Sequence, residues 1–408
     1  MNKFVITIGL VLLLSACSSD NSVTGEEPGG NEATVARTIE LSPEASQAAA
    51  AVQGFNVDFF RNVALSDEYK GKNVACSPVS ASMLLSLLSN AASNEAATEI
   101  ATVLGYSDTN ALNDLYTKLS TELPALDSKA TLTFANSVWY DKQYTLTDAF
   151  STVANDCYKA DVFKRDLSGA TPSVKNDINS WVSDKTTGLI KNITVKMPAL
   201  SALINATYFK AGWTYPFDKK YTSKATFKGI NGDSEIDMMV KTETYLYDET
   251  EDYKIIEVPF GAGAFAATFI LPTNGPEDFL KSEALKNILN KELHKSYRGL
   301  FLPRFKIAED EEINLTGVLY DMGIKSILNP QNIKMFNESP MAKDIKVSQK
   351  TSVEFKEDGA EAAGVTWLVP EGSDGTPIPA ITFDRPFIFL ITEKSTKTIL
   401  FAGKIMSL

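Results

Sequence analysis

The chain has 408 residues, of which 44% are hydrophobic and 22% are charged, a composition typical of a globular protein with a large core. Its formal net charge is −12, so it lacks the basic surface that nucleic acid requires, and no nucleic-acid partner is expected. The single histidine, His294, argues against hydrolases that need a positioned imidazole, and we expect it on an exposed helical segment. No cluster of His and Cys has metal-ligand spacing, and no phosphate-binding glycine motif occurs, so we predict neither a metal nor a cofactor.

Residues 1–16 predict a signal peptide, with Lys3 before an apolar core that is too short for a membrane span. The tetrapeptide L-S-A-C at its end resembles a bacterial lipobox, which implies cleavage before Cys17 and lipid attachment to that cysteine. An ordinary signal peptide with an incidental cysteine is the alternative. We therefore expect an exported protein, held by its lipid anchor at the outer membrane and exposed at the cell surface.

Residues 17–40 lack apolar periodicity and predict a flexible tether. The folded domain is expected over residues 41–408. Its first helix begins with Ser42 as a cap and Pro43 in the first turn.

A short strand is predicted at Asn73–Cys76, followed by a helix that is apolar almost all round and must lie inside the protein. Cys76 and Cys157 lie in separate segments, and we expect two free thiols there in preference to a disulfide. Further helices are predicted at residues 95–104, 110–123, 147–154 and 174–188, with short helices within residues 277–293. Strands are predicted at residues 132–140, 202–209, 225–227, 236–239, 254–259, 265–271 and 300–307, with a C-terminal hairpin that turns at 393–397.

The stretch Glu357–Thr366, E-D-G-A-E-A-A-G-V-T, follows an alternating strand pattern at Val347–Phe355 and precedes a Pro- and Gly-rich run at Val369–Pro379. If it became a strand, small residues would share one face: Ala360, Ala362, Gly364 and Thr366. Such a strand could enter between two existing strands without clashing with the layer beneath. The stretch can therefore be a loop in one state and a strand in another, although a plain surface loop is the alternative.

This stretch resembles the reactive-loop hinge of the serpin family, in which Gly, a small residue, Glu, Ala and Ala follow in the same order. Further segments resemble the family in sequence: S-P-x-S from Ser77, N-x-x-x-F-K-x-x-W-x-x-P-F from Asn205, L-P-R-F from Leu302 and the C-terminal hairpin. The resemblance extends over about residues 44–408. The chain as a whole resembles the lipoprotein serpins of bacteria. It implies an α+β serpin fold with three mainly antiparallel β-sheets, eight to nine helices and an exposed reactive-centre loop.

The resemblance also implies suicide inhibition of a protease, with no catalytic residue in this chain. A target cuts the loop around residues 368–376, and the hinge 357–366 inserts into the large sheet and traps the acyl-enzyme. The hinge positions it assigns are Glu357, Gly359, Ala360, Glu361, Ala362, Ala363, Gly364 and Thr366. The sheet-opening positions it assigns are Ser77, Pro78, Ser80, Asn205, Gln349 and Trp213.

Counting from Glu357 as in the family places the scissile bond at Ser373–Asp374. Counting back from the strand at Phe383 gives Gly375–Thr376, and cuts near Leu368 or Val369 are further alternatives. Small residues there suit an elastase-like or subtilisin-like serine protease, with a papain-like cysteine protease also possible. A monomer is expected.

Two departures from the family pattern keep a second function open. Gln349 stands where the family often has a His that bonds the residue matching Asn205, and a glutamine can still donate and accept. Pro370 would enter the lower part of the inserted strand without an N–H for the ladder. The alternative function is therefore a non-inhibitory serpin-fold binding protein or protease substrate.

Overall fold

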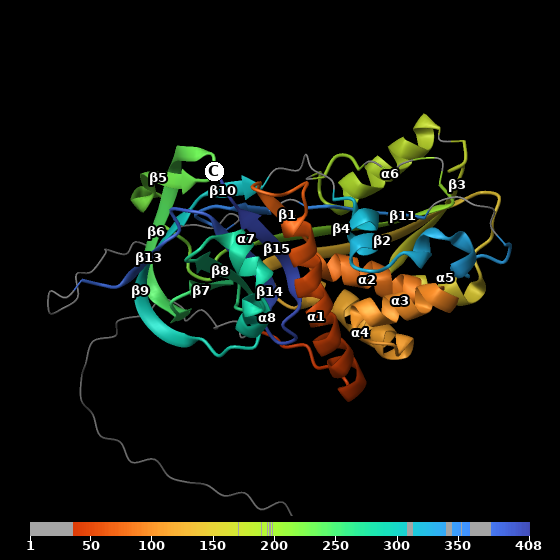
Figure 1. Ribbon diagram of the computed structural model, residues 1–408, viewed down its shortest axis with the longest axis horizontal. Coiled ribbons are helices and arrows are strands. Elements are labelled where there is room, and N and C mark those ends of the chain that lie inside the picture. The colour runs from red at the N-terminus through yellow and green to blue at the C-terminus, as the bar shows by residue number, and fades with distance from the viewer. Residues whose placement is uncertain are drawn as a thin grey trace, which may run out of the picture. The chain divides into compact units, whose positions relative to one another are not determined.

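The computed structural model describes residues 36–169, 171–188, 190–193, 195, 197, 199–307, 313–339, 345–351, 353–359 and 377–408. The α-helices within these residues are α1 (Pro43–Leu65), α2 (Pro78–Ser89), α3 (Asn94–Leu104), α4 (Thr109–Glu122), α5 (Asp148–Asp156), α6 (Pro172–Lys185), α7 (Pro276–Lys281), α8 (Ala284–Leu289) and α9 (Leu315–Asp321). Figure 1 shows α1 to α4, in red and orange, packed beside one another. The predicted helices are confirmed, with ends shifted by a few residues.

Two helix starts follow directly from the local sequence. The Ser42 hydroxyl accepts a hydrogen bond from the Ala45 N–H at 3.1 Å and caps α1, as predicted. α2 begins at Pro78, and every residue from there to Leu88 is buried. The predicted internal helix is therefore confirmed, and it lies against strand β4.

The strands are β1 (Val74–Cys76), β2 (Ala130–Asp141), β3 (Ala160–Arg165), β4 (Ser201–Ala211), β5 (Ser223–Gly229), β6 (Gly232–Glu249), β7 (Tyr253–Phe260), β8 (Phe265–Pro272), β9 (His294–Pro303), β10 (Phe305–Ile307), β11 (Ile345–Lys350), β12 (Val353–Phe355), β13 (Ala380–Thr382), β14 (Phe387–Glu393) and β15 (Ile399–Ile405). Within the described residues they form sheets of nine, four and two strands, and the predicted α+β class is confirmed. One expectation was wrong: His294 is exposed but opens β9, because its segment pairs with β6 opposite Tyr247.

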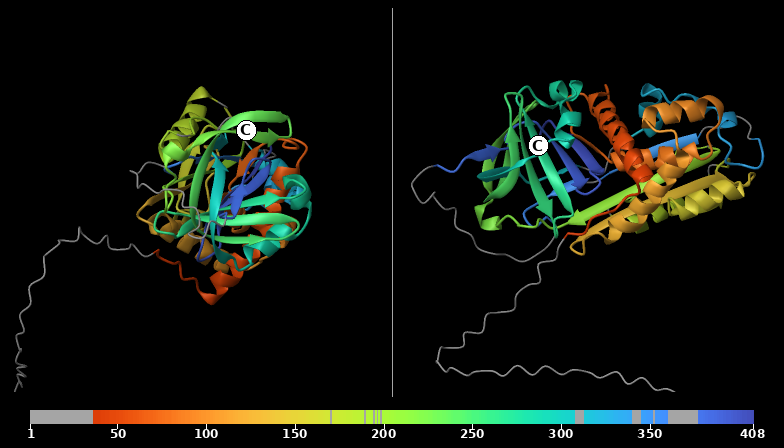
Figure 2. Two further views of the ribbon diagram at one scale, coloured as in Figure 1. Left: turned by 90° about the vertical axis from the view of Figure 1, so that its left-hand side faces the viewer. Right: turned by 90° about the horizontal axis from the view of Figure 1, so that it is seen from below.

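The four-stranded sheet has the order β11-β4-β2-β3 and is covered on both faces. Its side chains alternate between the faces. One set packs under α6 residues Ile178 and Trp181: Ala135, Trp139, Ala202, Ile204 and Ala206. α2 covers the opposite face. In the right-hand view of Figure 2 the long yellow-green arrow is β4, which crosses the molecule towards the nine-stranded sheet.

The strand predicted over Val347–Phe355 is two strands in the structure. β11 pairs with β4 from Ile345 opposite Ser201 to Lys350 opposite Ala206. β12 pairs with β10 instead, with Phe305 opposite Phe355. β4 is therefore closed against β11 but separate from β12, and the sheet opens at one end.

The nine-stranded sheet carries the C-terminal core. Its order is β1-β15-β14-β8-β7-β6-β9-β13, with β5 paired to β6. Three aromatic residues at and just before β14, Phe383, Phe387 and Phe389, are fully buried in this core. The hairpin of β14 and β15 is confirmed, and its turn is held by Glu393, whose carboxylate accepts from the Ser395 and Thr396 N–H groups at 2.7 and 2.8 Å.

The folded part begins before Leu41. Ile39 is buried, and its N–H donates to the Ser395 hydroxyl at 2.9 Å. Cys76 and Cys157 are free thiols, as predicted. In the part of the chain described above, no helix has the length and apolar character needed to cross a membrane, and no group of His, Cys, Asp and Glu is placed to hold a metal ion.

Candidate functional site

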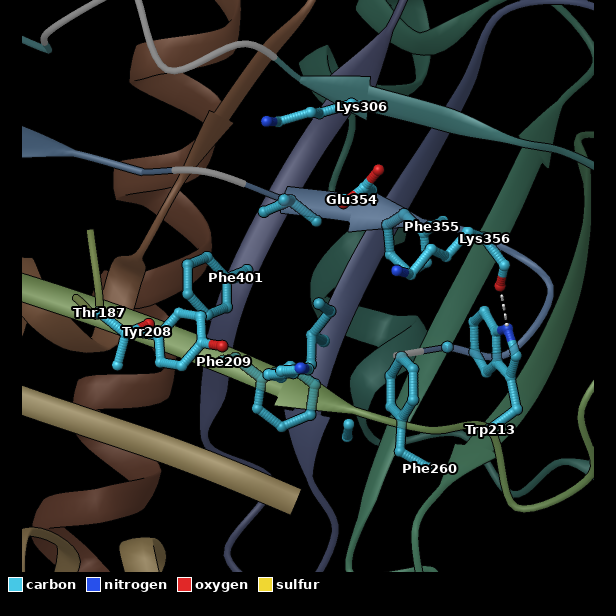
Figure 3. A pocket seen from close by; sticks show the side chains of 15 residues that line it. Thr187, Tyr208, Phe209, Trp213, Phe260, Lys306, Glu354, Phe355, Lys356 and Phe401 are labelled. Carbon is cyan, nitrogen blue, oxygen red and sulfur yellow. Dashed lines mark hydrogen bonds between the residues drawn. The ribbon is translucent and has the colours of Figure 1, made fainter. Parts of the chain in front are cut away.

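The opening between β4 and β12 contains a cavity of about 220 Å³, which we call the slot (Figure 3). Tyr208–Ala211 of β4 form one side, and Val353–Lys356 form the other. Because side chains alternate along both strands, the slot has two chemically different faces. The inner face looks towards the protein core, and the outer face looks towards solvent.

Aromatic side chains form the inner face. Trp213, which follows β4, stacks on Phe260 with ring centroids 4.4 Å apart and an interplanar angle of 10°. It also stacks on Phe355 of β12 at 5.8 Å, and Phe209 meets Phe260 edge-on at 5.3 Å. Phe401 of β15 adds to this lining. Such interlocked rings keep the inner face fixed, so a strand whose backbone fills the slot has room there only for small side chains.

Charged side chains surround the outer face. Lys210 and Lys306 are exposed, Lys356 is half-buried, and Glu354 is exposed between them. In Figure 3, Lys306, Glu354 and Lys356 lie on the side of the slot opposite Phe260. Lys210 and Lys356 place two ammonium groups against the carboxylate of Glu354 and make this face cationic, on a chain whose net charge is −12.

The hinge starts from a firmly held carboxylate. Glu357 is buried, and its Oε1 accepts from the Thr222 hydroxyl at 2.8 Å. Its Oε2 lies 3.6 Å from Arg304 Nη1, and its backbone oxygen accepts from the Phe217 N–H at 2.8 Å. Hydrogen bonds from Arg304 and Lys224 also hold the pKa of Asp237 below its usual value. The base of the loop is therefore anchored by charge as well as by packing.

Gly359 touches the end of β4. Its φ is +71°, and a Cβ at this position would lie 2.4 Å from the Trp213 backbone nitrogen and 2.6 Å from the Gly212 Cα. The Trp213 Nε1 donates to the Lys356 oxygen at 2.8 Å and closes the top of the slot. Only glycine permits both the backbone conformation and this close approach.

At the closed end, Gln349 is held by a backbone group on either side of its amide. Its Oε1 accepts from the Ser77 N–H and its Nε2 donates to the Ser77 carbonyl, both at 2.8 Å. Thr351 donates from its hydroxyl to the Ala75 carbonyl at 2.7 Å. These bonds tie the end of β11 to the segment that enters α2.

A buried polar chain connects the same segment to β4. Ser77 and Ser80 bond through their hydroxyls at 2.7 Å, and Ser80 bonds to the Thr207 hydroxyl. Thr207 donates to Asn205 Oδ1, and Asn205 Nδ2 donates to Asn136 Oδ1, both at 2.7 Å. Every member is paired, so the chain can hold the sheet without leaving a buried polar group unsatisfied.

On the outer surface of the sheet, Lys350 makes a further tie. It is buried, and its Nζ donates to the carbonyl and side-chain oxygens of Asn192 at 3.2 and 3.0 Å. Asn192 belongs to the segment that follows α6. β11 is therefore fastened on both faces of the sheet.

The predicted sheet-opening residues separate into two groups. Ser77, Ser80, Asn205 and Gln349 lie together around the start of α2, where Pro78 is the first helical residue. Trp213 lies at the other end, at the top of the slot. Gln349 stands opposite Asn205 in register, but its amide is bonded to the Ser77 backbone, so the predicted latch has a different partner.

Sequence reasoning missed several residues of this site. Thr207 and Asn136 lie in predicted strands at buried positions, and their polar side chains were the available signal. Lys350 follows Gln349 directly, and strand alternation places it on the opposite face. The remaining predicted positions lie outside the described residues: Cys17, Ala360, Glu361, Ala362, Ala363, Gly364, Thr366, Pro370, Ser373 and Asp374.

Comparison with known proteins gives a consistent result. A family model described as Serpin (serine protease inhibitor) matches residues 50–408. The chain is 26% identical to an uncharacterized serpin-like protein of Methanosarcina acetivorans over 99% of this chain and 98% of that one, and 30% identical to one of Thermococcus kodakarensis over 88% and 85%. The native state of the thermophilic serpin tengpin superposes with a TM-score of 0.79 at 27% identity, covering 93% of this chain and 99% of that one. Thyroxine-binding globulin in complex with thyroxine gives 0.77 at 26% identity, covering 88% and 99%.

Proposed function

We propose that this chain, which belongs to the serpin family, is a suicide inhibitor of a protease. The target cuts the loop around residues 368–376, and the hinge 357–366 then enters the slot as a new strand. The observation that carries the proposal is the separation of β4 from β12 directly beside the fixed hinge base. The chain offers a loop and an open sheet, and we propose no enzyme activity of its own.

The hinge sequence fits both faces of the slot. Small residues at every second position, such as Ala360 and Ala362, suit the crowded aromatic inner face. When Ala360 and Ala362 face inward in an inserted strand, Glu361 points outward, towards Lys210 and Lys356 on the cationic face. Steric fit and charge therefore favour the same orientation of the inserted strand, with the small residues inward and Glu361 outward.

The energy balance favours insertion once the loop is cut. Opening the sheet breaks the pairing of β11 with β4, which extends only from Ile345 to Lys350. A fully inserted strand gains on the order of a dozen ladder hydrogen bonds at about 1 kcal/mol each. It also buries apolar surface at about 25 cal/mol per Å². Release of stored strain by loop insertion is an established switching mode.

In the proposed reaction the serine Oγ of the target attacks the Ser373 carbonyl. The Ser373–Asp374 peptide bond breaks, and the new amino group leaves with Asp374. Insertion carries the acyl-enzyme away before water reaches the ester. We favour an elastase-like or subtilisin-like target because the residues at the bond are small, and a papain-like target would form the equivalent thioester.

A second function, a non-inhibitory serpin-fold binding protein or protease substrate, is favoured by two features. Gln349 fastens β11 to Ser77 through two hydrogen bonds, which opposes opening of the sheet. Pro370 would interrupt the ladder of an inserted strand. This function predicts that the loop is cut without trapping the protease.

The deciding experiment incubates full-length protein with the three protease types and analyses the products by denaturing gels and mass spectrometry. A complex at the summed mass less that of a released peptide, which begins at Asp374, supports inhibition at the proposed bond. Ala362→Glu, on the inner face, should convert trapping into simple cleavage, while Ala363→Glu, on the outer face, should trap normally. Cleavage without a complex, and without a rise in melting temperature, would instead establish the second function.

We further propose that residues 1–16 are removed on export, that Cys17 carries the lipid, and that the segment between Cys17 and the folded part, which includes Ile39, spaces the serpin domain, as a monomer, from the outer membrane at the cell surface. The apolar core before L-S-A-C supports this proposal. Mass spectrometry of the N-terminal peptide should find an acylated Cys17 that is lost in Cys17→Ser. An unmodified Cys17 in membrane-extracted protein would contradict it.

A further inference from the structure

We infer that, in the uncut protein, the slot binds a small amphipathic anion: one or two fused aromatic rings carrying a sulfonate or carboxylate. This is a ligand site in its own right, and binding does not depend on whether the protein inhibits a protease. The inference follows from the size, lining and charge of the slot.

The size of the slot limits the ligand. An apolar cavity of about 150 Å³ holds one benzene molecule. The slot, at about 220 Å³, therefore takes one substituted ring or two fused rings. Its lining suits such a ligand, because the rings of Trp213, Phe260 and Phe355, which stack on one another, form an apolar wall on the inner side.

The charge of the slot selects an anion. Lys210 and Lys356 outnumber Glu354, so these three side chains that line the slot together carry one net positive charge beside the aromatic floor. Lys210 and Lys356 make no salt bridge with any described carboxylate, so their ammonium groups are available to a ligand. A ligand whose ring lies against the inner face would direct its sulfonate to the outer face, where these lysines lie.

The ligand and the inserted strand would compete for the same space. Both require the region between Tyr208–Ala211 and Val353–Lys356. If the proposed inhibition holds, a bound anion delays insertion and allows water to complete the cleavage. Small aromatic anions would then convert the inhibitor into a substrate.

Isothermal titration calorimetry of full-length protein tests binding directly, with naphthalene-2-sulfonate as the probe and 2-naphthalenemethanol as its uncharged counterpart. The sulfonate should bind at least about fivefold more tightly than the alcohol, as expected for two exposed ionic contacts. Lys210→Gln with Lys356→Gln should remove that preference, whereas Glu354→Gln should strengthen sulfonate binding.

Lys70→Gln with Lys334→Gln provides the matched control, because both lysines are exposed and neither lines the slot. This control should leave the dissociation constant within about twofold. Equal binding of sulfonate and alcohol, or equal losses in the two double variants, would overturn the inference.

A second measurement separates this inference from the proposed function. With a trapped target, saturating sulfonate should raise the number of inhibitor molecules consumed for each protease inactivated. Inhibition without sulfonate binding overturns only the ligand site. Sulfonate binding without inhibition by any protease supports the ligand site and overturns only the inhibitory function.

Discussion

At Gly359 the backbone comes so near the end of β4 that a methyl group has no room. We expect Gly359→Ala to lower the free energy of unfolding by about 2–4 kcal/mol, because it adds steric overlap with Trp213 and Gly212 to the strain of a positive φ. Urea denaturation measures the change. Gly188→Ala is the control, since Gly188 has a φ of +79° with open space around it. Equal losses in the two variants would show that the contact with β4 contributes nothing.

Gln349 is a second position where a single residue makes a specific contact, since its side chain fastens β11 to the Ser77 backbone. Gln349→Glu keeps the shape but replaces the Nε2 donor that bonds the Ser77 carbonyl with an acceptor. We expect a loss of about 3 kcal/mol at neutral pH, because a buried charge then faces a carbonyl oxygen.

The loss in Gln349→Glu should shrink as the pH falls, since a protonated carboxyl can again donate to Ser77. Gln349→Ala removes both bonds at every pH and should show no such recovery. Thermal melts of the two variants between about pH 7 and pH 4.5 give the comparison. A parallel response of the two variants would argue against the proposed bonding.

At the scale of elements, Lys350 ties β11 to the segment after α6, and we expect this tie to restrain β11. Lys350→Ala removes the bonds to Asn192 and should cost about 1–2 kcal/mol. Hydrogen exchange should accelerate in β11 and in residues 190–193. Lys191→Ala, an exposed neighbour, should change stability by no more than about 0.5 kcal/mol. If both variants behave alike, the tie does not restrain β11.

Sequence patterns predicted most of the elements because their signals are local. α2 follows from a run after Ser77 in which only serines interrupt the apolar residues, and the last hairpin follows from two apolar strands around Glu393. The split of Val347–Phe355 into β11 and β12 could not be predicted, since the alternation continues through the break. Tertiary contacts determine which neighbour a strand pairs with, so the slot could not be predicted from the sequence.

The same limit applies to the partners within the site. Alternation predicts the face on which Gln349 lies, but no spacing rule says that its amide meets the Ser77 backbone. The network through Thr207 and Asn136 joins strands to α2 across many residues of sequence. Glu357 was identified by resemblance, whereas its contact with Arg304 required the folded chain.

Across the whole molecule, a buried lysine fastens the C-terminal strand to the helices. Lys404 of β15 is fully buried, and its Nζ donates to the Ala64 and Tyr69 carbonyls at 2.6 and 3.0 Å and to Glu277 at 2.7 Å. Burial raises the pKa of Glu277, but hydrogen bonds from Gly71 and Lys404 lower it by more, so its pKa lies below the ordinary 4.5. Its stabilising effect is therefore complete above the unfolded pKa and is lost as the pH falls through the lower folded value.

We expect Glu277→Gln to cost about 2–3 kcal/mol at neutral pH, because a buried ammonium loses its counter-charge. The difference from the unmodified protein should narrow as the pH is lowered from about 5 to about 3, where Glu277 itself becomes protonated. Urea denaturation across this range measures both effects, with the exposed Glu292→Gln as control. A stability difference between the two proteins that stays constant with pH would show that the charge of Glu277 does not cause it.

The directions of the strands beside the slot decide whether an inserted strand would pair in a parallel or an antiparallel way. β4 and β11 run the same way, whereas β2 runs opposite to β4 and β10 runs opposite to β12. A chain that leaves Phe355 and reverses beyond Gly359 must run opposite to both β4 and β12. Its entry would exchange one short parallel ladder for two antiparallel ladders, whose pairing is slightly more stable per residue. In the uncut sheet β11 is thus an edge strand paired in parallel with β4, and the protein's own loop is the segment whose direction would replace that pairing with antiparallel ones.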